Sequence, residues 1–111
     1  MQDFWQKLGH LLQTSELIID RPTGSHHPRY SSITYPLDYG YLAGTTAADG
    51  SGIDVWRGSL PEPVLDAVVC TVDILKRDTE VKLLLGCTPE EKELVLQFHQ
   101  NQYMSAVMVR R

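Results

Sequence analysis

The sequence lacks the features of a membrane-spanning, redox-active or nucleic-acid-binding protein. No apolar run approaches the roughly 18 residues that a membrane span needs. The two cysteines, Cys70 and Cys87, form no Cys-x-x-Cys pair and lie within apolar runs, which indicates buried reduced thiols. Acidic residues outnumber basic ones and the formal net charge is -4, so a nucleic-acid backbone is not an expected partner.

The N-terminal segment has no basic stretch followed by a long apolar run, so we expect no signal peptide and a cytoplasmic location. The length of 111 residues fits one domain, which we place at 1–111. Ordinary proportions of hydrophobic (42%) and charged (22%) residues are typical of a domain with its own core.

The hydrophobic pattern predicts an α+β fold that is mainly β. Apolar residues at helical spacing predict a short N-terminal helix over 4–12, and Thr88, Pro89 and Glu91 begin a C-terminal helix with a capping box. Short runs bounded by turn residues predict strands at 16–20, 30–34, 39–42, 54–56, 65–75, 80–85 and 105–109. Several short strands with a late helix predict a small OB-type β-barrel.

Two carboxylates, Asp49 and Asp54, flank the sequence Gly50-Ser51-Gly52. The glycines allow a tight turn, so both carboxylates can converge on the oxygen-rich kind of site that Mg²⁺ prefers. Taken alone, the pattern fits a simple turn at Asp49 with a solvated Asp54 better than a metal site.

A longer pattern surrounds these carboxylates. It is Tyr-Pro-x-x-Tyr-Gly over 35–40, then Thr45, then Asp-Gly-x-x-x-Asp-Val over 49–55. This pattern resembles the signature of family I soluble inorganic pyrophosphatases. The flanking segments 19–30 and 74–82 are similar to strands of the same family, so the resemblance extends from about residue 17 to about residue 82.

The resemblance implies Mg²⁺-dependent hydrolysis of inorganic diphosphate to phosphate, with Mn²⁺ as a possible substitute, by a homo-oligomer. It also implies roles for individual residues. The expected metal ligands are Asp20, Asp49, Asp54, Asp78 and Glu80, with Glu80 at a position where the family has aspartate. The expected phosphate-side and catalytic residues are Arg29, Tyr35, Tyr39 and Lys82, with Arg29 in place of a lysine.

Some family positions have changed. Ser51 stands where the family has an acid that assists deprotonation of the attacking water, and Ser31 replaces another acid. The segment 31–34 is too short for the hairpin that supplies an arginine. A slow diphosphatase, a metal/phosphate or nucleotide binding module without turnover, and a hydrolase of another phosphoanhydride therefore all stay open.

Other residues have simpler interpretations. We expect Trp56 to pack behind the site, and His99 to be structural or exposed. The apolar strand at 105–109 and the aromatic residues of the first helix predict self-association, because a domain this small has little surface to cover both.

Overall fold

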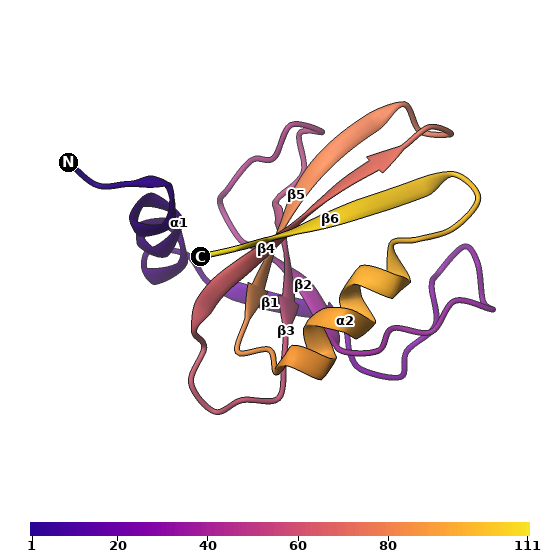
Figure 1. Ribbon diagram of the computed structural model, residues 1–111, viewed down its shortest axis with the longest axis horizontal. Coiled ribbons are helices and arrows are strands. Elements are labelled where there is room, and N and C mark those ends of the chain that lie inside the picture. Colours follow the sequence, from indigo (N-terminus) through magenta and orange to yellow (C-terminus); the bar gives the residue numbers. More distant parts are fainter.

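Six strands form one sheet, and two helices pack on parts of its opposite faces (Figure 1). The computed structural model describes all residues from Met1 to Arg111. The elements are α1 (Phe4–Gln13), β1 (Leu17–Arg21), β2 (Asp38–Leu42), β3 (Ile53–Arg57), β4 (Leu65–Asp73), β5 (Asp78–Leu85), α2 (Pro89–Phe98) and β6 (Met104–Arg110). The α+β class with a predominance of strand is thus confirmed. Neither helix is long and apolar enough to cross a membrane.

The strands lie in the order β1-β2-β3-β5-β4-β6. Neighbouring strands are antiparallel except β3 and β5, which run parallel. Strands β1 and β6 are the two edges and do not pair with each other, so the sheet stays open. The closed OB-type barrel that we expected from the sequence is therefore not confirmed.

Both predicted helices are present, and each begins at a capping box. In α2, the Thr88 side chain accepts from the Glu91 N–H, and the Glu91 carboxylate accepts from the Thr88 N–H. In α1, Asp3 and Gln6 make the corresponding pair of hydrogen bonds. These reciprocal bonds satisfy donors that the first helical turn leaves free, which explains where the helices begin.

The strand predicted at 30–34 is wrong. These residues belong to a loop that closes on itself, with the His27 N–H donating to the Ile33 carbonyl at 2.9 Å. Only one isolated bridge, between His26 and Thr34, connects the two sides of the loop. The β-branched and aromatic residues of this segment have no neighbouring strand to pair with. Their β-propensity depends on packing against such a strand, so it does not produce a strand here.

Two cores lie on the two faces of the sheet, because side chains alternate between the faces along each strand. On the α2 face, Trp56 is fully buried with Ala67, Val69, Leu84 and Val95. On the α1 face, the buried residues are Leu42, Val55, Leu65, Val68, Leu83 and Leu85. The packing role predicted for Trp56 is confirmed, and both cysteines are free, with Cys87 buried and Cys70 half-buried.

Gly40 lets β1 and β2 approach each other closely. A Cβ atom at this position would lie 1.8 Å from the carbonyl oxygen of Ile18, so no other residue fits without moving the strands apart. The close approach fixes the β2 backbone next to Tyr39, whose ring packs edge-on against Trp56 at 4.6 Å between centroids. Gly40 therefore helps to position a residue of the candidate site.

Candidate functional site

The buried ammonium group of Lys82 is the centre of a polar cluster on the α2 face. Its Nζ atom lies 2.7 Å from Asp54 Oδ2 and 2.7 Å from Glu80 Oε2. It also donates a hydrogen bond to the Tyr39 hydroxyl at 2.9 Å. The Lys82 residue is only 6% exposed, whereas both carboxylates are partly open to solvent.

The sheet explains why these side chains meet. Glu80 and Lys82 are two residues apart on β5 and therefore point to the same face. The parallel register pairs Val55 of β3 with Leu83 of β5, which places Asp54 beside Lys82. Tyr39 enters from the next strand, where it lies opposite Trp56. Three strands from separate parts of the chain thus supply one cluster.

Asp49 reaches the cluster from the loop between β2 and β3. Thr45 fixes the base of this loop, because its hydroxyl donates to the Leu42 carbonyl at 2.7 Å and accepts from the Ile53 N–H at 3.1 Å. Asp49 Oδ1 accepts from the Ser51 N–H at 3.0 Å. That hydrogen bond, followed by a side-chain interaction with Glu80 and the charge of Lys82, lowers the pKa of Asp49 below its usual value.

The electrostatics keep Lys82 charged and Tyr39 neutral. Burial alone would lower the pKa of Lys82, but the hydrogen bonds and charges of its partners raise it above the ordinary value. Burial raises the pKa of Tyr39, and the charge of Asp54 adds to this increase. Because Tyr39 is therefore neutral near pH 7, we assign the stabilisation of the Lys82 charge to Asp54 and Glu80.

A second group of aromatic and basic residues adjoins the first. The ring of Tyr35 lies 5.4 Å from that of Tyr39, and its hydroxyl accepts a hydrogen bond from Arg21 Nη1. His27 stacks on the other side of Tyr35 at 6.3 Å. Partial burial lowers the pKa of His27, and so do the charges of Arg21, Lys76 and Arg29. Positive charge thus gathers on the Tyr35 side of the carboxylates.

Three of the predicted residues lie outside the Lys82 cluster. Asp20 is exposed at an irregularity in β1 and makes no ion pair or side-chain hydrogen bond. Asp78 begins β5 opposite Asp73, on the same face as Glu80 but about 7 Å further along the strand. The Arg29 side chain is exposed in the loop before β2 and likewise forms no ion pair.

Two features of this site were not predicted from the sequence. Arg21 was missed, although its place next to Asp20 on an expected strand was a usable signal. Lys82 was expected to contact phosphate, but here it contacts two carboxylates instead. His99, expected to be structural or exposed, is a buried residue at the end of α2 that accepts from Trp56 Nε1 at 3.2 Å.

No protein-family model matches the chain, and no curated protein matches it significantly. The candidate site therefore depends on the geometry described above and on the motif residues of the sequence. Asp54, Glu80, Lys82 and Tyr39, which come from three strands, lie together in the fold, and Asp49 is on the adjoining loop.

A surface hollow of about 630 Å³ on the opposite face of the sheet is not a second candidate for the same chemistry. It lies between α1, the β2–β3 loop and the α1 face of the sheet, and apolar side chains such as Phe4, Leu8 and Val81 line most of it. Glu80 is its only acidic residue. An apolar lining does not suit a diphosphate, because nothing there replaces the water that solvates the anion.

Proposed function

We propose that this protein binds a divalent cation together with diphosphate at the Lys82 cluster and hydrolyses the diphosphate slowly to phosphate. The observation that supports the proposal is the convergence of two carboxylates, from Asp54 and Glu80, on one buried ammonium group, with Asp49 on the adjoining loop. Two carboxylates face a single ammonium group, and the negative charge of Asp49 adds to an excess that a cation would neutralise.

The donor set fits a hard cation such as Mg²⁺ or Mn²⁺. Each carboxylate uses one oxygen in the protein, namely Asp49 Oδ1, Asp54 Oδ2 and Glu80 Oε2. The other oxygens of Asp54 and Glu80 make no ion pair, and with Asp49 these carboxylates would hold the cation. A bound cation would supply acidification of water and neutralisation of phosphate charge.

The remaining residues would bind and orient the substrate. The Tyr39 hydroxyl, neutral because burial raises its pKa, can donate to a phosphate oxygen while it accepts from Lys82. On the Tyr35 side, Arg21, Arg29 and Lys76 would attract the anion. Ser51 cannot act as a carboxylate base at neutral pH, so we expect turnover to be slow.

Binding without turnover is the second candidate, and one observation favours it. Lys82 Nζ lies 2.7 Å from two of the three carboxylates, where it competes with a cation for their oxygens. No group of three or more His, Cys, Asp or Glu side chains in the structure has an arrangement that could already hold a metal ion. In this alternative, the cluster binds a cation with phosphate or a nucleotide, although more weakly because of Lys82, and the reaction has been lost.

One pair of measurements distinguishes the two. Phosphate release from diphosphate, with polyphosphate and nucleoside triphosphates as comparison substrates, is measured with Mg²⁺ or Mn²⁺. Calorimetry measures cation binding in the wild type, in Asp54→Asn and in the control Asp66→Asn, whose carboxylate pairs with Lys92 elsewhere. Hydrolysis is supported if phosphate is released slowly and if cation binding is lost in Asp54→Asn but not in Asp66→Asn. Binding without release supports the second candidate, and absence of both refutes the site.

The family resemblance brings two further expectations into the proposal. We infer an OB-type arrangement that is open at its edges, supported by the parallel β3–β5 pair within an otherwise antiparallel sheet. A cytoplasmic location also belongs to the proposal, since cellular diphosphate and its Mg²⁺ would be available there.

A further inference from the structure

Strand β6 pairs with β4 on one side only, and the pattern of that pairing shows which of its backbone groups are free. The register is unbroken along the whole of β6. At one end the Ile74 N–H donates to the Tyr103 carbonyl at 2.9 Å, and at the other the Arg111 N–H donates to the Asp66 carbonyl at 2.8 Å. Because hydrogen bonding alternates along an antiparallel strand, the odd-numbered residues of β6 bond to β4.

The even-numbered residues therefore direct their N–H and C=O groups away from the sheet. At the start of β6 these groups are already used: the Met104 N–H donates to Asn101 Oδ1 and the Met104 carbonyl accepts from the Asn101 N–H, both at 2.9 Å. The Ala106 carbonyl accepts from Gln100 Nε2 at 3.1 Å. Three outward-facing residues keep free groups, namely Ala106 at its N–H, Met108 and Arg110.

The side chains of β6 carry none of the devices that protect a sheet edge. The strand has no proline, no lysine and no bulge, which are the features that usually prevent pairing with another chain. On the α1 face, Val107 is 62% exposed and Val109 is 43% exposed. An open, regular and apolar edge of this kind is suited to accept another strand.

We propose that β6 pairs in an antiparallel manner with β6 of a second copy of this chain, in a register centred on Met108. Met108 then lies opposite Met108 of the second copy, and Ala106 lies opposite Arg110. The Met108 pair exchanges two bonds, and in each of the two Ala106–Arg110 pairs the free Ala106 N–H donates to the Arg110 carbonyl, about four bonds in all. In these two pairs the Arg110 N–H shares the Ala106 carbonyl with Gln100 Nε2. On the α1 face, each Val107 meets a Val109, and this contact covers the exposed valines.

The free groups select this register. A shift that brings Met104 into the pairing would require groups that Asn101 already occupies. The opposite shift leaves only Met108 and Arg110 to form hydrogen bonds, and the free Ala106 N–H then has no partner. The register centred on Met108 uses every outward residue with a free group and no other, which makes the edge complementary to itself.

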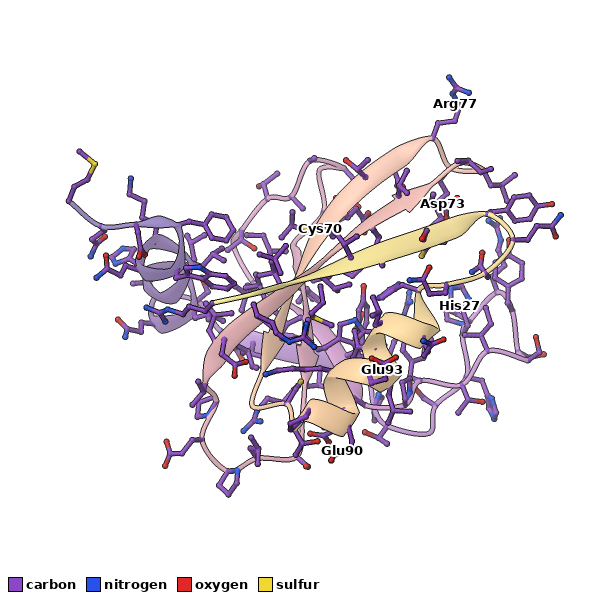
Figure 2. The ribbon with its side chains drawn as sticks, in the orientation of Figure 1. His27, Cys70, Asp73, Arg77, Glu90 and Glu93 are labelled. Carbon is purple, nitrogen blue, oxygen red and sulfur yellow. The ribbon has the colours of Figure 1, made fainter.

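Charge also favours a second copy as the partner. Arg110 and Arg111 form no ion pair within the chain. In the proposed register, Arg110 of one copy lies beside Ala106 of the other, on the face that α2 covers. Ala106 packs against the same buried cluster as Leu96 of α2. Leu96 is one helical turn after Glu93, which is exposed on α2 (Figure 2). The basic end of each copy thus approaches the acidic helix of the other.

Sedimentation of the full chain tests the proposal, and we expect a dimer at micromolar concentration. Val107→Lys should weaken dimerisation about 100-fold, because a lysine on the edge is driven into the apolar contact. The control Val81→Lys changes an equally apolar, exposed residue of the same face on β5, which β4 separates from β6, and should leave the dimer intact. A monomeric wild type, or a dimer that Val107→Lys leaves unchanged, overturns the proposal.

The register is tested separately with oxidised glutathione. Residues opposite each other in a hydrogen-bonded pair are about 5.5 Å apart at Cα, within disulfide reach. Met108→Cys should therefore form a cross-linked dimer, whereas Ala106→Cys should not, because its partner is Arg110. Circular dichroism of both variants shows whether they are folded. Faster cross-linking of folded Ala106→Cys than of folded Met108→Cys overturns the register.

Discussion

Replacement of Lys82 by methionine tests the Lys82 cluster most directly. Methionine keeps most of the apolar length of the side chain but removes the ammonium group, which lies 5.4 Å from the centre of the Tyr39 ring. Asp54 and Glu80, both 2.7 Å from that group in the wild type, then face each other without a positive charge between them. Removal of one partner from a buried ion pair costs about 3–5 kcal/mol.

The size of this loss is large for a domain of this length, whose total stability is expected to be about 5–15 kcal/mol. With a urea slope of about 2 kcal/mol/M, a loss of about 4 kcal/mol lowers the unfolding midpoint by about 2 M. The fluorescence of the fully buried Trp56 follows the transition. Measurements are made at pH 7 in the presence of a chelator, so that no divalent cation replaces the lysine.

Lys92→Met is the matched control. Lys92 also forms an ion pair, at 2.9 Å from Asp66, but the Asp66 side chain is 44% exposed. The Lys92 side chain is 12% exposed, so the pair is only partly open to solvent. Because water reaches the carboxylate, we expect the control to lose less than Lys82→Met, closer to the about 0–1 kcal/mol of a surface pair. Addition of Mn²⁺ should then restore stability to Lys82→Met, by about 2.7 kcal/mol at 100 times the dissociation constant. Equal losses in the two variants would refute the central role of Lys82.

Three further predictions concern other parts of the fold. Burial lowers the pKa of His99 to about 3, so the neutral form of His99 contributes fully to stability above pH 6.5. Up to about 5 kcal/mol of the free energy of unfolding is lost as the pH falls from 6.5 to 3. Urea titrations at several pH values should show this loss in the wild type and not in His99→Gln. Ser51→Asp should raise diphosphate hydrolysis, by up to about 100-fold if the missing base is the main defect; unchanged phosphate release with cation bound would contradict this. Gly40→Ala should prevent stable folding, because its Cβ would lie 1.8 Å from the Ile18 carbonyl oxygen. In the control Gly9→Ala, the added Cβ has nothing within 4 Å and should stabilise α1 by about 0.5–1 kcal/mol, which raises the thermal midpoint.

The parts of the fold that depend on local sequence were predictable. Thr88 and Glu91 identify the start of α2 because both partners of the capping box lie within one helical turn. The strands around Asp54 and Glu80 follow from short apolar runs between turn residues. The loop at 30–34 and the open sheet were not predictable, since both depend on which distant strand lies alongside.

The same distinction applies to the candidate site. The motif predicted that Asp49, Asp54 and Glu80 would meet; Asp54 and Glu80 both contact the Lys82 ammonium, whereas Asp49 lies on the adjoining loop and makes no ion pair with it. It could not show that the ammonium of Lys82 would lie between two of the carboxylates, because that depends on the parallel register of β3 and β5. Nor could it show what Arg21 would contact, because the position of its side chain is set by packing against Tyr35 and Tyr39.

The parallel pairing of β3 with β5 also has a consequence for the order of folding. The β4–β5 hairpin can form from adjacent residues, but β3 can join β5 only after the chain between them has reversed twice. Contacts between distant segments must bear the entropy of closing the intervening chain, so they form late. Asp54 should therefore meet Lys82 after the rate-limiting step, and substitutions there should speed unfolding while they leave the refolding rate nearly unchanged.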